Sequence, residues 1–427
     1  MVGLFADRRT RHMILLLMMT EFFWGMGAYF VLPTTTVPTY LKTLGAPAII
    51  QGVTYVAFCS LPMLLGLFSR AIIERFPHRK RGLVILHFIA ITPYLLVPLL
   101  DHLLAGRQNA LLMALIILLL GISQLTLGAI APAWLDMIAQ VIPPSARGRY
   151  FGLAAGFVSV GGIFGGSALI GLQHWLGTGV FHGAFLATAI CYSIGMLMFW
   201  LAPIHETTFD HPPEPALQLR LRKALAACHL RLDFGRFVAG NSLQALAVAI
   251  LPFLVIYATD LKGLHLPQGI FSTLTLLQAL GGATGAFALG WWADHRGARW
   301  PWLVMTLFIP LIVLLYPLGT LAPILILCTL LVGMLNSGWA VSVPALLEYS
   351  PDGDKSGYIA IANLIGFPFA LAGPLLIGSI IEGNGYPMAF IMTGVTGLAA
   401  FAISLAIRGR RQMSHPHQEV TVDTTDQ

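Results

Sequence analysis

Charged side chains are scarce in this 427-residue chain: Asp, Glu, Lys and Arg together make up 10% of it, while apolar residues make up 57%. A water-soluble domain of ordinary composition carries about 25% charged residues. The shortage of charge therefore excludes a soluble protein of this length. It predicts an all-α membrane protein whose surroundings are mostly lipid.

Cysteine is also rare, and its four copies, Cys59, Cys191, Cys228 and Cys328, stand far apart with no Cys-x-x-Cys pair. This spacing signals neither a disulfide framework nor a thiolate zinc site. The phosphate-binding loop of ATP-driven pumps, the His-Glu-x-x-His zinc motif and the Gly-x-Ser-x-Gly nucleophile motif are absent as well. We therefore expect no enzyme activity, no bound metal and no organic cofactor, with an ion gradient supplying the energy.

Long apolar runs dominate what is present. About twelve of them can cross a bilayer, since roughly 20 residues rising 1.5 Å each span a hydrocarbon core of about 30 Å. They begin near Met13, Ile49, Leu83, Ala110, Gly152, Phe181, Phe234, Pro267, Pro301, Leu321, Tyr358 and Met388. The sequence thus predicts twelve transmembrane helices.

Basic residues lie almost entirely on one side of these runs. With the N-terminus inside, only Lys42, Arg107 and Lys262 of the 24 Lys and Arg residues fall outside. Because cytoplasmic loops concentrate Lys and Arg, both termini are predicted to be cytoplasmic, in a multi-pass protein of the cell's inner membrane. The net charge of +6 then reflects topology and lipid headgroups rather than a nucleic-acid surface. We expect a monomer whose partners are the bilayer and a small-molecule substrate.

A polar interval divides the chain into two halves of six runs each. The predicted domains are a first half at 1–203, a cytoplasmic linker at 204–233, a second half at 234–408 and a disordered cytoplasmic tail at 409–427. Leucines alternate with basic residues in the linker, which predicts an amphipathic helix along the headgroups; a partner-binding helix is the alternative. A weak repeat supports two halves, because Pro143 and Tyr150 recur 208 positions later as Pro351 and Tyr358.

One loop carries a recognisable motif, which reads Gly290-Trp-Trp-Ala-Asp294-His-Arg-Gly297-Ala-Arg299. Together with the layout of the runs, it resembles the loop signature of the major facilitator superfamily. The resemblance implies twelve transmembrane helices in two pseudo-symmetric six-helix halves, with this loop holding the cytoplasmic side closed in one conformation. We expect Gly290 to let helices approach, Gly297 to permit a tight turn, and Asp294 to cap a helix or pair with a cation of the other half.

The first half departs from this pattern, because Arg70 and Ile73 stand where the aspartate and the second glycine belong. The segment from Trp134 to Gly152 resembles a bacterial branch of the same superfamily. Within it we expect Asp136, near the cytoplasmic end of the fourth run, to cap a helix or to pair with Arg147 or Arg149.

Three glycines of the fifth run, Gly152, Gly161 and Gly165, are spaced as in the drug/proton antiporters of that superfamily, although Gly166 replaces the proline that follows there. A glycine that faces lipid gives a helix no advantage. A glycine that faces another helix allows the neighbouring backbone to come close. Ordinary tight helix packing is the alternative to antiport.

Glu21 is the most informative single residue, because it lies about 12 Å into the first run. An ionised carboxylate at that depth costs about 2.5–3.5 kcal/mol unless it faces protein or water. No Lys or Arg lies at a matching depth in any run. We predict that Glu21 couples solute movement to proton movement. Binding a cationic group of the substrate, or a structural hydrogen bond to a neighbouring helix, are the alternatives.

The resemblance also implies that the first, fourth, seventh and tenth runs line a central cavity. Polar and aromatic candidates in those runs are Trp24, Tyr29, Gln124, Asn241, Gln244, Asn336 and Trp339. Interhelical hydrogen bonds explain the amides equally well. His87 is expected to be a buried structural residue.

The leading hypothesis is a secondary active transporter that moves a small solute by alternating access, with proton coupling. The absence of deep cations disfavours an anionic substrate, so a neutral or cationic organic molecule is expected, with export one of the two directions. A transporter of a metal ion or metal complex, and a non-transporting sensor or scaffold on the same fold, are the alternatives.

Overall fold

The chain is described by a computed structural model for residues 8–66, 68–143, 146–204, 226, 232–350 and 355–408. Within these ranges the side chains at 70, 139, 148, 339, 347, 355–357 and 359–361 are not described. The predicted amphipathic linker helix and the predicted disordered tail therefore lie outside the described residues. Every regular element found in the described ranges is a helix.

The first half of the chain forms nine α-helices. Their bounds are α1 Arg8–Phe30, α2 Thr36–Thr43, α3 Ala48–Cys59, α4 Leu61–Gly66, α5 Ser69–Ile73, α6 Arg79–Leu104, α7 Asn109–Val141, α8 Arg147–Leu176 and α9 Val180–Leu201, with a 3-10 turn at Gly177–Gly179. Several predicted runs are therefore broken. The first run corresponds to α1, and α2 follows it after Pro33, whereas the second run divides into α3 and α4.

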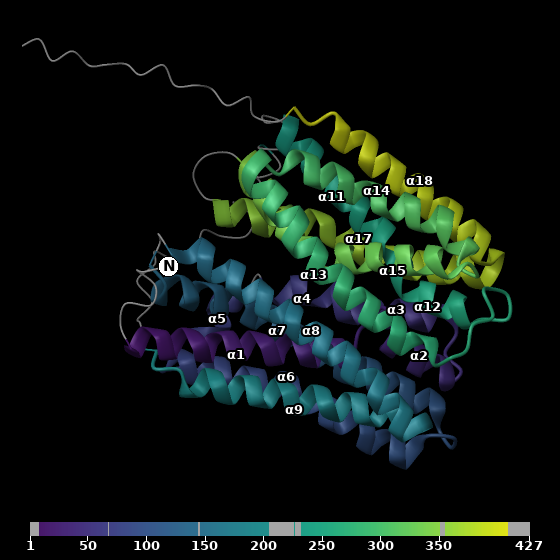
Figure 1. Ribbon diagram of the computed structural model, residues 1–427, viewed down its shortest axis with the longest axis horizontal. Coiled ribbons are helices and arrows are strands. Elements are labelled where there is room, and N and C mark those ends of the chain that lie inside the picture. The colour runs from purple at the N-terminus through teal and green to yellow at the C-terminus, as the bar shows by residue number, and fades with distance from the viewer. Residues whose placement is uncertain are drawn as a thin grey trace, which may run out of the picture.

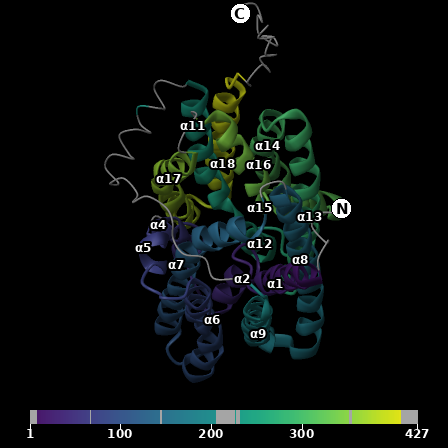
Figure 2. The same ribbon diagram turned by 90° about the vertical axis from the view of Figure 1, so that its left-hand side faces the viewer.

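The second half begins at Leu232 in the described residues. Its bounds are α11 Leu232–Ala247, α12 Leu251–Thr259, α13 Ile270–Arg296, α14 Arg299–Leu315, α15 Ala322–Asn336, α16 Trp339–Tyr349, α17 Lys355–Asn384 and α18 Tyr386–Leu405, with 3-10 turns at Val248–Ile250 and Tyr316–Leu318. Figures 1 and 2 show these helices stacked above the helices of the first half.

Ten helical stretches of the described residues are long and apolar enough to cross a membrane, or eleven if the bent pair Ala322–Asn336 and Ala340–Leu346 is one span. One of the ten, Arg149–Leu201, has 53 residues, more than twice the ~20 that a bilayer needs, and it contains both α8 and α9. The prediction of an all-α, multi-pass membrane protein is confirmed. The count of twelve stays a prediction.

The two halves meet along two long helix contacts, α8 with α13 and α3 with α17. Both contacts depend on glycine. An added Cβ at Gly166 in α8 would lie 2.9 Å from Leu276 Cα, and one at Gly52 in α3 would lie 2.3 Å from the Pro374 carbonyl oxygen. Side chains larger than hydrogen at these points would push the halves apart, so the glycines set the distance between them.

Polar contacts join the halves at the end of the molecule where α2, α3 and α12 lie (Figure 1). The Thr34 hydroxyl donates to Gln278 Oε1 at 2.6 Å, and the hydroxyls of Thr35 and Thr275 are 2.6 Å apart. This end is the one predicted to be extracellular. The halves are therefore closed against each other on that side.

Lys42 of α2 strengthens the same closure. Its Nζ donates to Thr259 Oγ1 at 3.1 Å and lies 3.9 Å from Asp260 Oδ2 in the other half. Burial lowers the pKa of Lys42, while the nearby Asp260 carboxylate opposes that shift. Lys42 is one of the three basic residues on the predicted extracellular side, and the structure gives it a role in joining the halves.

Replacing Lys42 with methionine is expected to loosen this end of the molecule. The side chain contributes a hydrogen bond and a weak ion pair, together worth about 1–2 kcal/mol, so the open population should rise about tenfold. Electron-electron distance measurements between spin labels at Thr43 and Leu261 should show a longer component. The exposed Lys262→Met variant is the matched control, and identical distance distributions in both variants would contradict the assignment.

Candidate functional site

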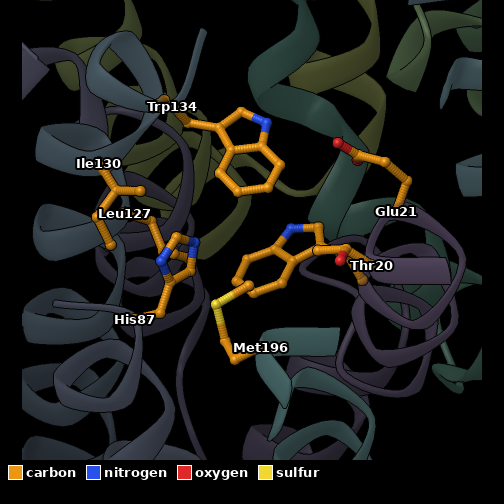
Figure 3. Close-up of a pocket in the computed structure, with 9 residues that line it drawn as sticks. Thr20, Glu21, His87, Leu127, Ile130, Trp134 and Met196 are labelled. Carbon is orange, nitrogen blue, oxygen red and sulfur yellow. The ribbon is translucent and has the colours of Figure 1, made fainter. Parts of the chain in front are cut away.

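A cavity of about 220 Å³ lies inside the first half, between α1, α6, α7 and α9. Nine residues line it: Thr20, Glu21, Trp24, His87, Leu127, Ile130, Ala131, Trp134 and Met196 (Figure 3). Every one of them belongs to the first half. The cavity is thus a feature of one half and not of the interface between the two.

Helical spacing explains why these residues share one space. On α7 the lining positions 127, 130, 131 and 134 recur at intervals of three and four, which places them on one face of the helix. On α1 positions 20, 21 and 24 do the same. Between these two faces, α6 contributes His87 and α9 contributes Met196, because α6 packs on both α7 and α9.

Glu21 is the only acidic residue of this lining. The indole of Trp134 points toward its carboxylate (Figure 3) and is its hydrogen-bond partner. Tyr150 of α8 is an electrostatic neighbour of Glu21, and its fully buried hydroxyl has no hydrogen-bond partner. None of the ion pairs formed between the described residues includes Glu21. A carboxylate is therefore held in an apolar, aromatic space without a neutralising cation.

Aromatic rings surround the carboxylate. Trp24 stacks on Tyr192 with ring centroids 4.0 Å apart, and the His87 ring meets Trp24 edge-on at 5.3 Å. His87 also lies 6.2 Å from Trp134. Its Nδ1 is 2.8 Å from the Leu83 carbonyl oxygen, which only accepts, so Nδ1 carries a proton and donates to that oxygen. The lining therefore contains the aromatic rings of Trp24, His87 and Trp134.

Of the residues predicted to line a cavity, the structure places Glu21 and Trp24 in this one. The other predicted residues lie elsewhere. Gln124 donates to the Tyr94 hydroxyl at 3.2 Å, and Asn336 donates to Gln278 Oε1 at 3.1 Å. Tyr29 lies between the two halves, because an added Cβ at Gly162 or Gly282 would lie 2.6 Å and 2.9 Å from its side chain. Gln124 and Asn336 therefore make interhelical hydrogen bonds of the kind that the alternative described.

Gln244 behaves differently from those amides. It is buried, and neither its oxygen nor its nitrogen has a hydrogen-bond partner. Asn241, one turn earlier on α11, is partly buried. The side chain of Trp339 lies outside the described residues. The second half thus carries an unpartnered amide, but it is not part of the cavity around Glu21.

Seven of the nine lining residues were not predicted as site residues, and His87, Trp134 and Met196 are among them. The sequence did contain a feature that could have indicated Trp134. This residue lies at helical spacing from other apolar residues of α7 and two positions before Asp136. His87 was expected to be structural, and its hydrogen bond to Leu83 does hold it in place. Neither residue's position relative to Glu21 could be derived from spacing within one helix.

The motif loop between α13 and α14 is held by its own half. Gly297 has a φ of +80°, which favours glycine and provides the expected tight turn. The backbone N–H of Ala298 donates to Glu348 Oε2 at 3.0 Å. An added Cβ at Gly290 would meet nothing nearer than Ala340 Cβ at 4.0 Å, so this glycine is not at the close helix contact that was expected. Asp294 is exposed.

The remaining gate candidates lie at the same end of the molecule. Asp136 forms an ion pair with Arg79, the first residue of α6, and its pairing with Arg147 or Arg149 stays a prediction. Arg147 donates from Nε to the Ile142 carbonyl at 3.1 Å, while Arg149 is exposed. The guanidinium of Arg299 lies over the Trp300 ring at 5.3 Å. Arg79 is therefore the partner of Asp136 that the sequence analysis did not name.

The glycines of the fifth run divide into two kinds. An added Cβ at Gly161 would lie 2.0 Å from the Phe22 carbonyl oxygen, and one at Gly165 would lie 2.3 Å from the Met26 carbonyl oxygen. Gly152 has no atom within 4 Å of such a Cβ. Gly161 and Gly165 thus allow α8 to press against the backbone of α1, beside Glu21, and Gly152 has no such role.

Known structures have the same fold. A mutant of the nucleoside transporter NupG superposes with a TM-score of 0.69 at 14% identity, covering 92% of this chain and 99% of that one. A D-xylose-proton symporter gives a TM-score of 0.66 at 14% identity over 93% of this chain and 97% of its own. The peptide-transporter-family protein PepTSo gives 0.67 at 12% over 92% and 96%. The fold is that of a membrane transporter.

Sequence comparison adds the family. The model described as Major Facilitator Superfamily matches residues 232–422. Uncharacterized MFS-type transporters from two strains of Mycobacterium tuberculosis are 28% identical over 182 residues, which is 39% of this chain and 40% of each relative. The matched segment thus spans less than half the length of these relatives. Residues 232–422 are therefore similar in sequence to the major facilitator superfamily, and the fold of the chain is similar to that of solved membrane transporters.

Proposed function

We propose that the protein is a secondary active transporter that moves a small organic solute by alternating access, and that Glu21 couples this movement to protons. The observation that carries the proposal is the carboxylate of Glu21, the single acidic residue lining a cavity between transmembrane helices. Ionisable residues at membrane depth that face a cavity mark ion or proton pathways in membrane proteins.

The surroundings of Glu21 support a carboxylate that changes its charge. Trp134 supplies one donor, the His87 ring lines the cavity, and the buried Tyr150 hydroxyl, an electrostatic neighbour of Glu21, has no hydrogen-bond partner. In so apolar a space a lone negative charge is costly. A proton removes that cost, and a positively charged solute group offsets it. Glu21 can therefore alternate between the two.

The contacts between the halves support alternating access. The two glycine-lined helix pairs, α8 with α13 and α3 with α17, let the halves slide at close distance without interlocking side chains. The hydroxyl and Lys42 contacts on the predicted extracellular side are few and polar. Rocking of one half against the other would break these contacts.

Proton movement in vesicles tests the proposal. Purified protein in liposomes that contain a pH-sensitive dye is exposed to a panel of solutes, including choline, tetramethylammonium, nucleosides, D-xylose and dipeptides. We expect at least one solute to evoke proton flux, and Glu21→Gln to abolish that flux because the amide cannot exchange a proton. Glu382→Gln, an exposed carboxylate that binds the Ile49 N–H, is the matched control.

Two results would refute the proton role and the transport role separately. A Glu21→Gln protein that still moves solute with full dependence on the pH gradient would show that Glu21 is not the coupling residue. A wild-type protein that moves no solute of the panel, with or without a gradient, would favour the sensor or scaffold alternative.

A further inference from the structure

We propose that the cavity around Glu21 binds a small organic cation, whose quaternary ammonium or protonated amine group contacts the Glu21 carboxylate and the ring faces of Trp24 and Trp134. This proposal names the substrate class of the proposed transporter. It rests on the proposed function in one respect, which is that this cavity is the site where the solute binds. It is supported by the chemistry of the lining, its aromatic geometry and its size.

The lining offers acceptors and almost no free donors. The Thr20 hydroxyl donates to the Leu16 carbonyl at 2.9 Å, and the proton on His87 Nδ1 is bound to the Leu83 carbonyl. The Trp134 N–H is directed at Glu21. Among the donor groups of the lining named above, the Trp24 N–H is the one for which no partner is described. An anion would find a negative carboxylate and one N–H, so the cavity excludes anions.

The aromatic rings are placed as cation–π partners. Cations bind over the faces of indole rings at up to about 6 Å, with an attraction that grows as water is removed. Tyr192 covers one face of Trp24, and His87 stands edge-on to that ring. Trp134 lies on the opposite wall of the cavity from Met196, whose thioether is also polarisable (Figure 3). The walls thus present electron-rich surface on several sides.

The size of the cavity limits the solute. Sites for drug-sized ligands measure about 300–1,000 Å³, and this cavity holds about 220 Å³. It therefore suits a compact cation of few heavy atoms. A bare metal ion is a poorer match, because no group of three or more His, Cys, Asp or Glu residues in the described part of the chain is arranged to hold one.

The experiment compares a cation with its uncharged twin. Choline and 3,3-dimethyl-1-butanol have nearly the same shape, but a carbon replaces the charged nitrogen in the second. Binding to purified protein in detergent, without any gradient, is measured by titration calorimetry and by the rise in melting temperature, since a ligand that binds the folded state stabilises it. Tetramethylammonium and tetraethylammonium extend the series in size.

The expected result is that choline and tetramethylammonium bind and that 3,3-dimethyl-1-butanol binds at least about tenfold more weakly. Trp134→Leu and Glu21→Gln should each weaken cation binding about tenfold, and Trp134→Phe should weaken it less because it keeps an aromatic face. Trp175→Phe replaces an indole that is 83% exposed and should leave binding unchanged. The Phe variant also guards against a Leu variant that fails to fold.

Three outcomes would overturn the proposal: none of the cations binds, the uncharged twin binds as tightly as choline, or the Glu21 and Trp134 variants bind cations as well as the wild type. These outcomes are separate from failure of the proposed function. Cation binding without any flux in vesicles would refute transport and leave the cation site standing. Proton-coupled flux of a neutral solute without cation binding would support the transport function and refute the cation site.

Discussion

Gly161→Ala is expected to destabilise the protein more than any other one-carbon substitution proposed for it. The new Cβ would lie 2.0 Å from the Phe22 carbonyl oxygen and 2.9 Å from the Met26 backbone nitrogen. Both are backbone atoms, so no side-chain rotation relieves the clash and α1 itself must move. Overpacking of this kind costs about 1–3 kcal/mol, and more where the backbone is fixed.

The shift would also reach the cavity, because Phe22 follows Glu21 directly. We therefore expect Gly161→Ala to lower the melting temperature in detergent by several degrees and to weaken any activity that depends on Glu21. Gly152→Ala on the same helix is the control, since its Cβ would meet no atom within 4 Å. Equal melting temperatures for the two variants, measured by fluorescence-detected size-exclusion chromatography, would mean that α8 does not press on α1 as described.

Asp136→Asn is expected to destabilise the protein by a similar amount, because it removes a charge from an ion pair. Its partner Arg79 has a side chain that is 4% exposed, whereas that of Asp136 is 35% exposed. Removing one member of a buried ion pair destabilises a protein by about 3–5 kcal/mol. Because Asp136 is partly solvated, we expect the lower end of that range, about 3 kcal/mol, as a loss of folded protein on heating.

A double variant separates the charge from the packing. When both members of a buried pair are replaced by apolar residues, stability is often retained, so Arg79→Met combined with Asp136→Leu should melt near the wild type and above Asp136→Asn. The melting curves of the three proteins provide the measurement. If Asp136→Asn alone unfolds at the wild-type temperature, the ion pair contributes nothing to the stability of the protein.

Most of the fold could be predicted from the sequence because the bilayer imposes it. Runs of apolar residues have to become helices there, since no water satisfies the backbone, and the confirmed membrane helices follow those runs. The breaks in the helices were not predicted, although Pro33 and the Ser337-Gly338 pair mark two of them. Such breaks depend on which neighbouring groups satisfy the freed backbone, and that depends on tertiary packing.

The candidate site was predicted less completely. Glu21 and Trp24 were found because charge and large aromatic rings are conspicuous in an apolar helix, and the structure places both in one cavity. His87 and Trp134 were not predicted as their neighbours. Helices that are apolar on every side give no sequence signal of which face turns inward, so the rotation of α6 and α7 is set by packing alone. Asn336 and Gln124 illustrate the same point, because both turned to partners on adjacent helices.

The confinement of the cavity to one half of the molecule has a consequence for energy conversion. A ligand shifts an equilibrium between two shapes only as far as it binds one shape better than the other. If the first half moves as one unit, the lining of the cavity keeps the same geometry in both conformations. A ligand bound in the cavity then favours neither conformation by its contacts with that lining alone. Under the proposed mechanism, the bias has to arise where α1 and the turn that follows it contact the opposite half, at Tyr29 against Gly282 and at Thr34 against Gln278.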